Sequence, residues 1–145
     1  MLATPNIREA RRDELSQIVT LYNLMWMDSV NPIDLKVAQN VFDQMQLNRQ
    51  WMFVVEMDDR VVASFMMLIA DSNEPECVLD NVVVHPRYQR KGIGRMIVMF
   101  VAEHSKNRGC RRIVGSIREK HELSSAFWES MGFERRPGGF FKNIE

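Results

Sequence analysis

The residues best suited to chemistry form a basic, glycine-containing segment that follows a run of valines. In order, they are Val82, Val83, Val84, His85, Pro86, Arg87, Tyr88, Gln89, Arg90, Lys91, Gly92, Ile93, Gly94 and Arg95. This pattern predicts a buried strand, a basic loop and the first turn of a helix. A helix N-terminus offers unpaired N–H groups and the positive end of the helix dipole, and glycine lets a ligand approach the backbone. The segment therefore predicts a diphosphate site, with an ordinary glycine turn as the alternative interpretation.

Two well-known nucleotide-binding loops do not fit this segment. A Walker loop requires Gly-Lys followed by Ser or Thr, and the chain contains no such tripeptide. A dinucleotide-binding fingerprint requires a third glycine and a βαβ unit near the N-terminus. Here Ile97 stands at the third position, and several predicted strands come first. The ligand is therefore expected to be a diphosphate bound in some other way.

The elements that must position this segment follow from periodicity and turn residues. Helices are predicted over 13–27, 35–47, 92–108 and 123–131, and strands over 7–10, 51–57, 60–69, 77–84 and 111–116. Two weak strands begin at Phe133 and Phe140, and Asp58-Asp59 forms a hairpin turn. The helix at 35–47 is expected to place Val37/Ala38, Val41/Phe42 and Met45 on one face. This order predicts a mixed α/β sheet in one domain covering 1–145.

Composition limits the class of protein. Apolar residues make up 46% of the chain and charged residues 26%, which is enough for one core. No apolar run approaches the roughly 20 residues that span a bilayer, so no membrane association is expected. The two cysteines, Cys77 and Cys110, cannot alone form a disulfide framework or a zinc site, so no metal is expected. The first residues also lack the pattern of a signal peptide, so a cytoplasmic location is expected.

The charges are unevenly distributed along the chain. Residues 1–84 hold six basic and thirteen acidic side chains, and residues 85–145 hold thirteen basic and six acidic ones. The C-terminal half could thus receive an anion and the N-terminal half attract a cation, or the asymmetry could reflect two solvated surfaces. The basic residues are not interleaved with the aromatic platforms of single-strand binders, so no nucleic-acid partner is expected.

Two motifs at matching spacing carry a family resemblance. Q-R-K-G-I-G at 89–94 resembles the Q/R-x-x-G-x-G/A signature of the GNAT N-acetyltransferase superfamily, and V-V-V-H-P precedes it as in that family. F-W-E-S-M-G-F at 127–133 resembles the later F-Y-x-x-x-G-F element of the family. The stronger resemblance covers about 77–133. It implies a GNAT-type mixed, largely antiparallel central sheet flanked by helices, with splayed fourth and fifth strands.

The resemblance also implies a reaction. Acetyl-CoA would be the co-substrate, and the acceptor would be a primary amine of a small molecule or peptide. Dimers are common in this family, so a homodimer is one expectation. The first two helices and their connection would hold the acceptor, where Met25, Trp26, Met27 and Asp28 cluster, although core packing is the alternative interpretation for these residues.

The resemblance assigns the cofactor contacts residue by residue. The pantetheine arm would lie between the splayed strands and pair with the backbone of Val82 and Val84 like an added strand. The backbone N–H of Val83 or Val84 would face the developing oxyanion. The pyrophosphate would be held by backbone amides from Arg90 through Lys91, Gly92 and Ile93 to Gly94, with Gln89 leading in. Plain core packing is the alternative for Val82 and Val84.

The general base is sought among carboxylates of the fourth predicted strand. Asp80 is the sole acidic residue within 77–84, and regular alternation would place it on the face of Val82. It would act directly or through water, whereas a carboxylate bonded to loop N–H groups is the alternative. Asn81 would form a strand bulge or orient the substrate, and Glu56 is a weaker base candidate. His85 is expected to be a loop histidine.

The chain departs from the family where the acid usually stands. The family has Tyr where this chain has Trp128, and an indole donates a hydrogen bond but is not an acid near neutral pH. Because a thiolate leaves readily, the acid is expected to be dispensable. His121 occupies a position where the family often has Asn near the pantetheine, and a helix-start residue is the alternative. The loss of tyrosine motivates a second hypothesis, a non-catalytic acyl-CoA-binding module of the same fold.

Overall fold

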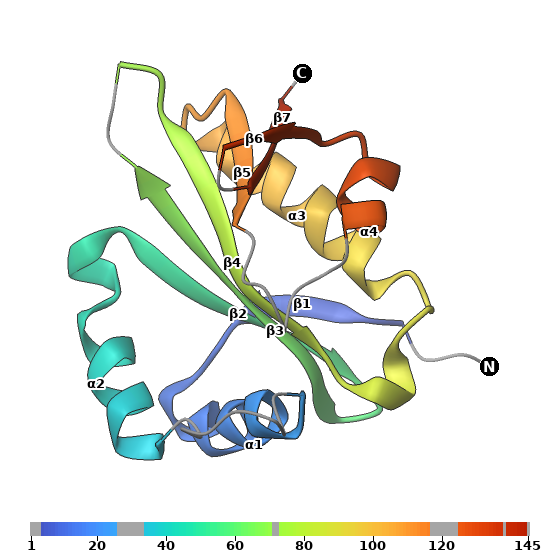
Figure 1. Cartoon of the computed structure of the whole chain (residues 1–145). Coiled ribbons are helices and arrows are strands. Elements are labelled where there is room, and N and C mark those ends of the chain that lie inside the picture. The colour runs from blue at the N-terminus through green and yellow to red at the C-terminus, as the bar shows by residue number, and fades with distance from the viewer. Residues whose placement is uncertain (1–3, 26–33, 71–72, 117–124, 138, 145) are drawn as a thin grey trace.

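The sheet and the helices that cover it are seen in a computed structural model, which describes residues 4–25, 34–70, 73–116, 125–137 and 139–144 (Figure 1). The strands are β1 (Asn6–Glu9), β2 (Gln50–Met57), β3 (Arg60–Ala70), β4 (Glu76–Val84), β5 (Arg112–Ser116), β6 (Glu134–Arg136) and β7 (Gly139–Asn143). The α-helices are α1 (Leu15–Met25), α2 (Leu35–Gln44), α3 (Ile93–Asn107) and α4 (Ser125–Ser130).

The strands form one mixed sheet with the order β1-β2-β3-β4-β5-β7-β6. Adjacent strands are antiparallel except β4 and β5, which are parallel. Helices cover both faces of the sheet (Figure 1). The prediction of a mixed, largely antiparallel sheet flanked by helices is therefore confirmed.

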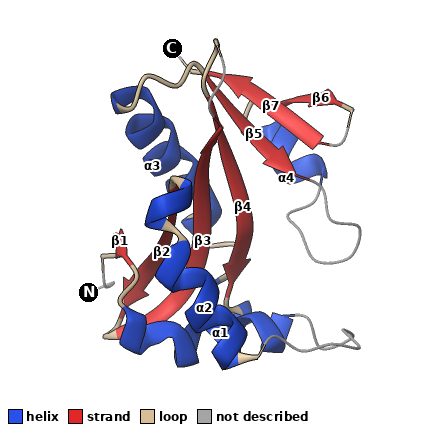
Figure 2. Ribbon diagram, turned by 90° about the vertical axis from the view of Figure 1, so that its left-hand side faces the viewer, coloured by secondary structure: helices blue, strands red, loops and turns tan. Residues whose placement is uncertain are grey.

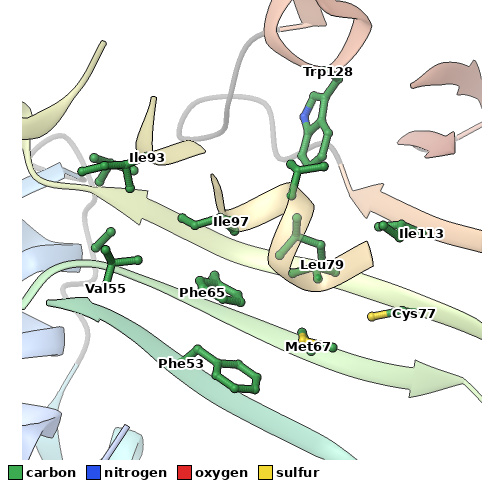
Figure 3. Close-up of a cluster of buried hydrophobic side chains, with 14 of the residues drawn as sticks. Phe53, Val55, Phe65, Met67, Cys77, Leu79, Ile93, Ile97, Ile113 and Trp128 are labelled. Carbon is green, nitrogen blue, oxygen red and sulfur yellow. The ribbon is translucent and has the colours of Figure 1, made fainter. Parts of the chain in front are cut away.

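Two hydrophobic clusters hold the layers together, one on each face of the sheet. On the α3 and α4 face, Phe65 of β3, Ile97 of α3 and Trp128 of α4 are almost completely buried (Figure 3). On the α1 face, Leu15 and Tyr22 pack against Val54 of β2. We call the two sides the α3 face and the α1 face. Because β4 contributes to both clusters, its side chains connect the two layers.

The second helix is less buried than its sequence pattern predicts. It begins after Asp34, whose side chain accepts a hydrogen bond from the backbone N–H of Lys36 at 2.7 Å, an N-cap arrangement. Val37 and Val41 are 56% and 43% exposed, whereas Phe42 and Met45 pack in the α1-face cluster, so only part of the predicted apolar face meets the core. The helix lies at the margin of the α1 layer (Figure 1), so Met45 just after its end is the residue that enters the core.

Two aspartates form the turn between β2 and β3. Asp58 and Asp59 have φ values of 52° and 61°. Two consecutive left-handed residues are the hallmark of the type I′ turn, whose twist matches that of the strands it joins. The predicted hairpin is confirmed.

A charged cluster ties β1, β2 and the start of α1 together. Arg8 of β1 donates to both carboxylate oxygens of Glu14, at 2.8 and 2.7 Å, and to Glu56 of β2 at 2.9 Å. The backbone N–H of Arg11 also donates to Glu14, which is only 3% exposed. Glu56 therefore neutralises Arg8 and lies on a strand that β3 separates from β4. This position argues against Glu56 as the general base.

We expect Glu14→Gln to lower the free energy of unfolding by about 2 kcal/mol at neutral pH, because it removes a charge-assisted hydrogen-bond pair. The hydrogen bond from Arg8 holds the pKa of Glu14 below its ordinary 4.5, so its stabilisation is complete above that pH and is lost as the pH falls. Thermal unfolding between pH 3 and pH 7 should show a shallower acid decline in Glu14→Gln than in the natural protein. Parallel declines would contradict this role.

Candidate active site

The segment after β4 folds as a short loop that leads into a helix. A 3₁₀ turn spans Pro86–Tyr88, and the Nδ1 atom of His85 accepts a hydrogen bond from the backbone N–H of Arg87 at 3.1 Å. His85 therefore caps this turn, as expected of a loop histidine. The side-chain amide of Gln89 donates to the Val84 carbonyl at 3.0 Å, which ties the loop to the end of the strand.

The backbone between this loop and α3 is shaped for an anion. Arg90 and Gly92 both have left-handed backbones, with φ values of 61° and 82°. Such alternation turns successive N–H groups toward a common concavity, and the first turn of α3 adds its own unpaired N–H groups. A Cβ at Gly92 would have no atom of the described residues within 4 Å, so those residues leave space in front of it. The predicted strand, loop and helix N-terminus are confirmed, and phosphate binding stays a prediction.

Two glycines bring α4 against the rest of the site. A Cβ at Gly94 of α3 would lie 2.9 Å from the ring of Phe127, and a Cβ at Gly115 of β5 would lie 2.8 Å from the indole of Trp128. Because neither glycine has a side chain, α4 can pack closely against α3 and β5. The two sequence motifs meet where Gly94 lies against Phe127. Gly94 consequently has a packing role that the sequence analysis did not anticipate.

The parallel strands β4 and β5 separate beside this helix. Their register runs from Glu76↔Arg112 to Leu79↔Gly115. Beyond Leu79, β4 continues to Val84 along β3, and Figure 2 shows β4 and β5 diverging. The predicted splay of the fourth and fifth strands is confirmed. We call the last paired position, Leu79↔Gly115, the apex of the splay.

The backbone of β4 presents hydrogen-bonding groups to the opening. The N–H of His85 donates to the Val62 carbonyl of β3 at 2.8 Å. Because successive residues of a strand turn their backbone groups to opposite sides, Val83 also faces β3, and Val82 and Val84 face the opening. The Val84 carbonyl accepts a hydrogen bond from the Gln89 side chain. The groups directed toward the opening are then the N–H of Val84 and the backbone N–H and carbonyl of Val82. This direction is the one that pairing with an added strand requires.

A β-bulge interrupts β4 within the splayed segment. Ser64 pairs with Val83 but Met66 pairs with Asp80. Two residues of β4, Asn81 and Val82, therefore lie opposite a single residue of β3. Asn81 has a φ of 52°, and its carbonyl accepts a hydrogen bond from the Tyr22 hydroxyl of α1. The expected bulge at Asn81 is therefore confirmed.

The bulge overturns the expectation that Asp80 and Val82 share a face. Asp80 is paired with Met66, which packs on the α1 face, whereas Val82 packs on the α3 face. The extra residue of the bulge inverts the alternation between them. An Asp80 carboxylate oxygen accepts from the backbone N–H of Asn81 at 2.8 Å. Asp80 thus lies beside the splay, on the side covered by α1.

Trp128 occupies the opposite side of the splay. Its side chain is 2% exposed, and its indole packs against Phe133 and Phe140 at centroid distances of 4.8 and 6.1 Å. Its Nε1–H has no hydrogen-bond partner in the part of the chain that the structure describes. A buried donor without a partner lowers the stability of the folded state by about 1–3 kcal/mol, so an acceptor at this atom would be stabilising.

Two residues of this region were missed from the sequence. Tyr22 lies within the predicted helix 13–27 and has no assigned role in the sequence analysis, although its hydroxyl contacts the bulge. Gly115 lies inside a strand, where a glycine often marks close approach of another group, and that signal could have found it. His121 and the residues 26–28 near the expected acceptor site lie outside the described residues.

Metal-ligand groups, cysteines and helix lengths were also compared with what a metal site, a nucleophile and a membrane crossing require, in the described part of the chain. It contains no group of three or more His, Cys, Asp or Glu side chains that could hold a metal. Cys77 and Cys110 are both buried free thiols, and burial raises the pKa of Cys77 to about 11, which makes it a poor nucleophile. Within the described ranges, every helix falls short of the length and apolarity that a membrane crossing requires.

The sequence of this chain is similar to those of known N-acetyltransferases. The [Ribosomal protein bS18]-alanine N-acetyltransferase of Salmonella typhimurium is 31% identical over 77 residues, which are 52% of this chain and 49% of that protein. The glucosamine 6-phosphate N-acetyltransferase of Trypanosoma brucei brucei is 34% identical over 55 residues, which are 38% of this chain and 35% of that protein. The matches thus span about half and about a third of these relatives.

Solved structures show the same fold at lower identity. A predicted acetyltransferase with acetyl-CoA from Clostridium acetobutylicum has a TM-score of 0.74 and 16% identity, with 92% of each chain covered. Other solved acetyltransferases share the fold as well. The model of the Acetyltransferase (GNAT) family matches residues 16–133, a range that holds the bulged strand, the loop at 89–94 and both glycine contacts of α4. By this match, this chain belongs to the GNAT acetyltransferase family.

Proposed function

We propose that this protein transfers an acetyl group from acetyl-CoA to a primary amine of a small molecule or peptide. The observation that carries the proposal is that β4 runs on beyond its last pair with β5, Leu79↔Gly115, to the loop that precedes Gly92. A diphosphate at one end and an extended, amide-bearing arm along the edge have the chemistry of coenzyme A. The solved relative with acetyl-CoA supports this cofactor.

The described residues divide the work of the reaction. Backbone groups of Val82 and the Val84 N–H would pair with the pantetheine arm. The loop from Gln89 to Gly94 would hold the pyrophosphate, with the first-turn N–H groups of α3 as donors. An N–H at the free edge of β4 would also stabilise the negative charge that develops on the thioester oxygen.

Asp80 is proposed as the general base. An amine is mostly protonated at neutral pH, so the attacking nitrogen must lose a proton before it can react. Asp80 lies on the α1 face and Trp128 on the α3 face, so the amine and the departing sulfur would use opposite sides of the sheet. This arrangement lets the acceptor enter without crossing the path of the coenzyme.

The acceptor is a cation in its resting state, which suits the negative N-terminal half of the chain. Residues 1–84 carry an excess of seven negative charges and include the helices on the α1 face. The two relatives act on a ribosomal protein alanine and on glucosamine 6-phosphate, according to their names, so they do not fix one acceptor class. Peptide and small-molecule amines are both proposed, with the cytoplasm as the compartment.

One feature favours a second candidate function. Trp128 cannot supply the proton that the family's usual tyrosine supplies, so a domain that binds acyl-CoA without turnover is the alternative. Release of free thiol from acetyl-CoA in the presence of a panel of amines separates the two functions. Acetylated product detected by mass spectrometry would establish the enzyme, and binding without product would establish the binding module.

We expect acetyl-CoA in large excess over its Kd to raise the melting temperature clearly, because a ligand that binds only the folded state stabilises it by RT ln(1 + [L]/Kd). Dephospho-coenzyme A should raise it less, since exposed basic residues near the loop, such as Arg90 and Lys91, are available for the 3′-phosphate. Differential scanning fluorimetry measures both shifts. The absence of a shift with either ligand would contradict both candidate functions.

A further inference from the structure

The hydroxyl of Tyr22 joins helix α1 to the bulge of β4. Tyr22 is 5% exposed and lies with Leu15, Val54 and Val83 in the cluster on the α1 face. Its hydroxyl donates a hydrogen bond to the carbonyl of Asn81, the bulge residue with a φ of 52°. Figure 2 shows α1 near the end of β4. A buried tyrosine thus binds one backbone carbonyl of the strand that borders the opening.

This contact fixes the orientation of a whole peptide group. The Asn81 carbonyl and the Val82 N–H belong to one planar unit, and no cis peptide bond occurs among the described residues. In a trans peptide the carbonyl and the N–H point in opposite directions. Because the carbonyl points to Tyr22 on the α1 layer, the Val82 N–H points away from that layer. Regular alternation from Val83, which faces β3, also directs the Val82 N–H toward the opening.

The bulge residue is held by several neighbours. The Asn81 N–H donates to the Asp80 carboxylate at 2.8 Å, and its side-chain amide contacts the Met66 sulfur at 3.1 Å. A left-handed backbone is unfavourable for a residue other than glycine, so it persists where surrounding groups hold it. Of these contacts, the hydrogen bond from Tyr22 is the one that acts on the peptide carrying the Val82 N–H.

The proposed acetyl transfer gives this N–H a chemical role. Attack of the amine nitrogen on the thioester carbon places a negative charge on the carbonyl oxygen. The electron pair then returns from that oxygen, and the thiolate is expelled. A backbone N–H that already points at the oxygen stabilises the charge without having to reorient. A hydrogen bond to the carbonyl of the same peptide polarises the unit, which makes its N–H a stronger donor.

We propose that Tyr22 is a positioning residue, whose hydroxyl orients and polarises the Asn81–Val82 peptide so that the Val82 N–H binds the thioester oxygen. This proposal rests on the proposed function. Tyr22 keeps its proton throughout the reaction, and its effect passes through the one peptide group that it binds. The Val82 carbonyl stays available to the pantetheine arm. Tyr22 therefore acts on the acetyl group and leaves the binding of the coenzyme itself unchanged.

The test changes the donor at position 22 and keeps the ring. Tyr22→Phe deletes the donor, and incorporation of 4-aminophenylalanine supplies an N–H donor that is weaker than the phenol. Ser105→Ala is the matched control, because Ser105 is also fully buried and its hydroxyl donates to a backbone carbonyl, that of Val101 within α3. The measurements are kcat with the best amine of the panel, calorimetric affinity for coenzyme A, and the infrared stretch of the thioester carbonyl in bound acetyl-CoA.

We expect Tyr22→Phe to lower kcat about tenfold, because a misdirected oxyanion donor is a geometric error beside the reacting atoms. Affinity for coenzyme A, which has no acyl oxygen, should not change. The carbonyl stretch of acetyl-CoA bound to the natural protein should lie at a lower frequency than in solution, and Tyr22→Phe should return it toward the solution value. The aminophenylalanine protein should give intermediate values, and Ser105→Ala should change the melting temperature alone.

A lower melting temperature in Tyr22→Phe with an unchanged kcat and carbonyl stretch would show that the hydroxyl serves folding alone. Equal losses of kcat in Tyr22→Phe and Ser105→Ala would also overturn the proposal, because reduced stability would then explain both. If the natural protein is active but neither kcat nor the carbonyl stretch follows donor strength at position 22, the proposed function stands and the role of Tyr22 is rejected. A natural protein that does not bind acetyl-CoA would instead contradict the proposed function itself.

Discussion

Asp80→Asn is expected to lower kcat/KM for amine acetylation by about 10²-fold or more, the usual scale of a lost general base. The amide oxygen can still accept from the Asn81 N–H, a bond now 2.8 Å long, so the bulge should remain. The melting temperature should therefore change little. Steady-state kinetics with the best amine of the panel measures the effect.

The pH dependence separates a base from a structural carboxylate. As the pH rises, more of the acceptor amine is already neutral, so the deficit of Asp80→Asn should shrink toward the pKa of the amine. Glu56→Gln is the matched control, because Glu56 pairs with Arg8 on β2 and should leave turnover unchanged. A large drop in melting temperature with normal turnover per folded molecule would show that Asp80 serves the bulge alone.

Gly94→Val is expected to lower the free energy of unfolding by about 1–3 kcal/mol and to reduce coenzyme A affinity as well. A Cβ alone would lie 2.9 Å from the Phe127 ring, and valine adds two methyl groups to that clash. Phe127 must then move, and with it the start of α4 beside the phosphate loop. Thermal unfolding measures the first effect, and calorimetric titration with coenzyme A measures the second.

A second substitution separates packing from phosphate contact at Gly94. Phe127→Ala in the Gly94→Val background removes the ring that valine would meet, so it should recover much of the lost stability. If the Gly94 backbone also approaches the pyrophosphate, affinity should stay low in the double variant. Recovery of both stability and affinity would show that Gly94 matters through α4 alone. Gly92→Ala is a useful comparison, because its Cβ would meet no atom of the described residues and its cost there comes from a left-handed backbone.

The position of the two candidate groups has a consequence for selectivity. Asp80 on the α1 face and Trp128 on the α3 face share the opening between β4 and β5 but contact different layers. Under the proposed function, changes in α1 and α2 would alter acceptor binding without disturbing coenzyme binding. On the α3 face, any side chain added at Gly94 or Gly115 would meet an aromatic ring of α4.

The sequence by itself determined the local elements, including the loop between β4 and α3. The hairpin at Asp58-Asp59, the strand before His85 and the helix after Gly92 follow from residues that are neighbours in the chain. Turn chemistry, apolar periodicity and the conformational freedom of glycine act over a few residues. They can therefore be recognised in the sequence before the fold is known. Spacing between the two motifs was enough for the family resemblance.

The tertiary structure alone decided which groups share a face and which space is open. The bulge that separates Asp80 from Val82 arises in the pairing of β4 with β3, and strand register depends on a partner that local sequence does not reveal. Likewise, Gly94 and Gly115 are adapted to rings that lie more than ten residues away along the chain. The unpartnered nitrogen of Trp128 is visible only once α4 has packed on β5, because burial and hydrogen-bond satisfaction are properties of the assembled core.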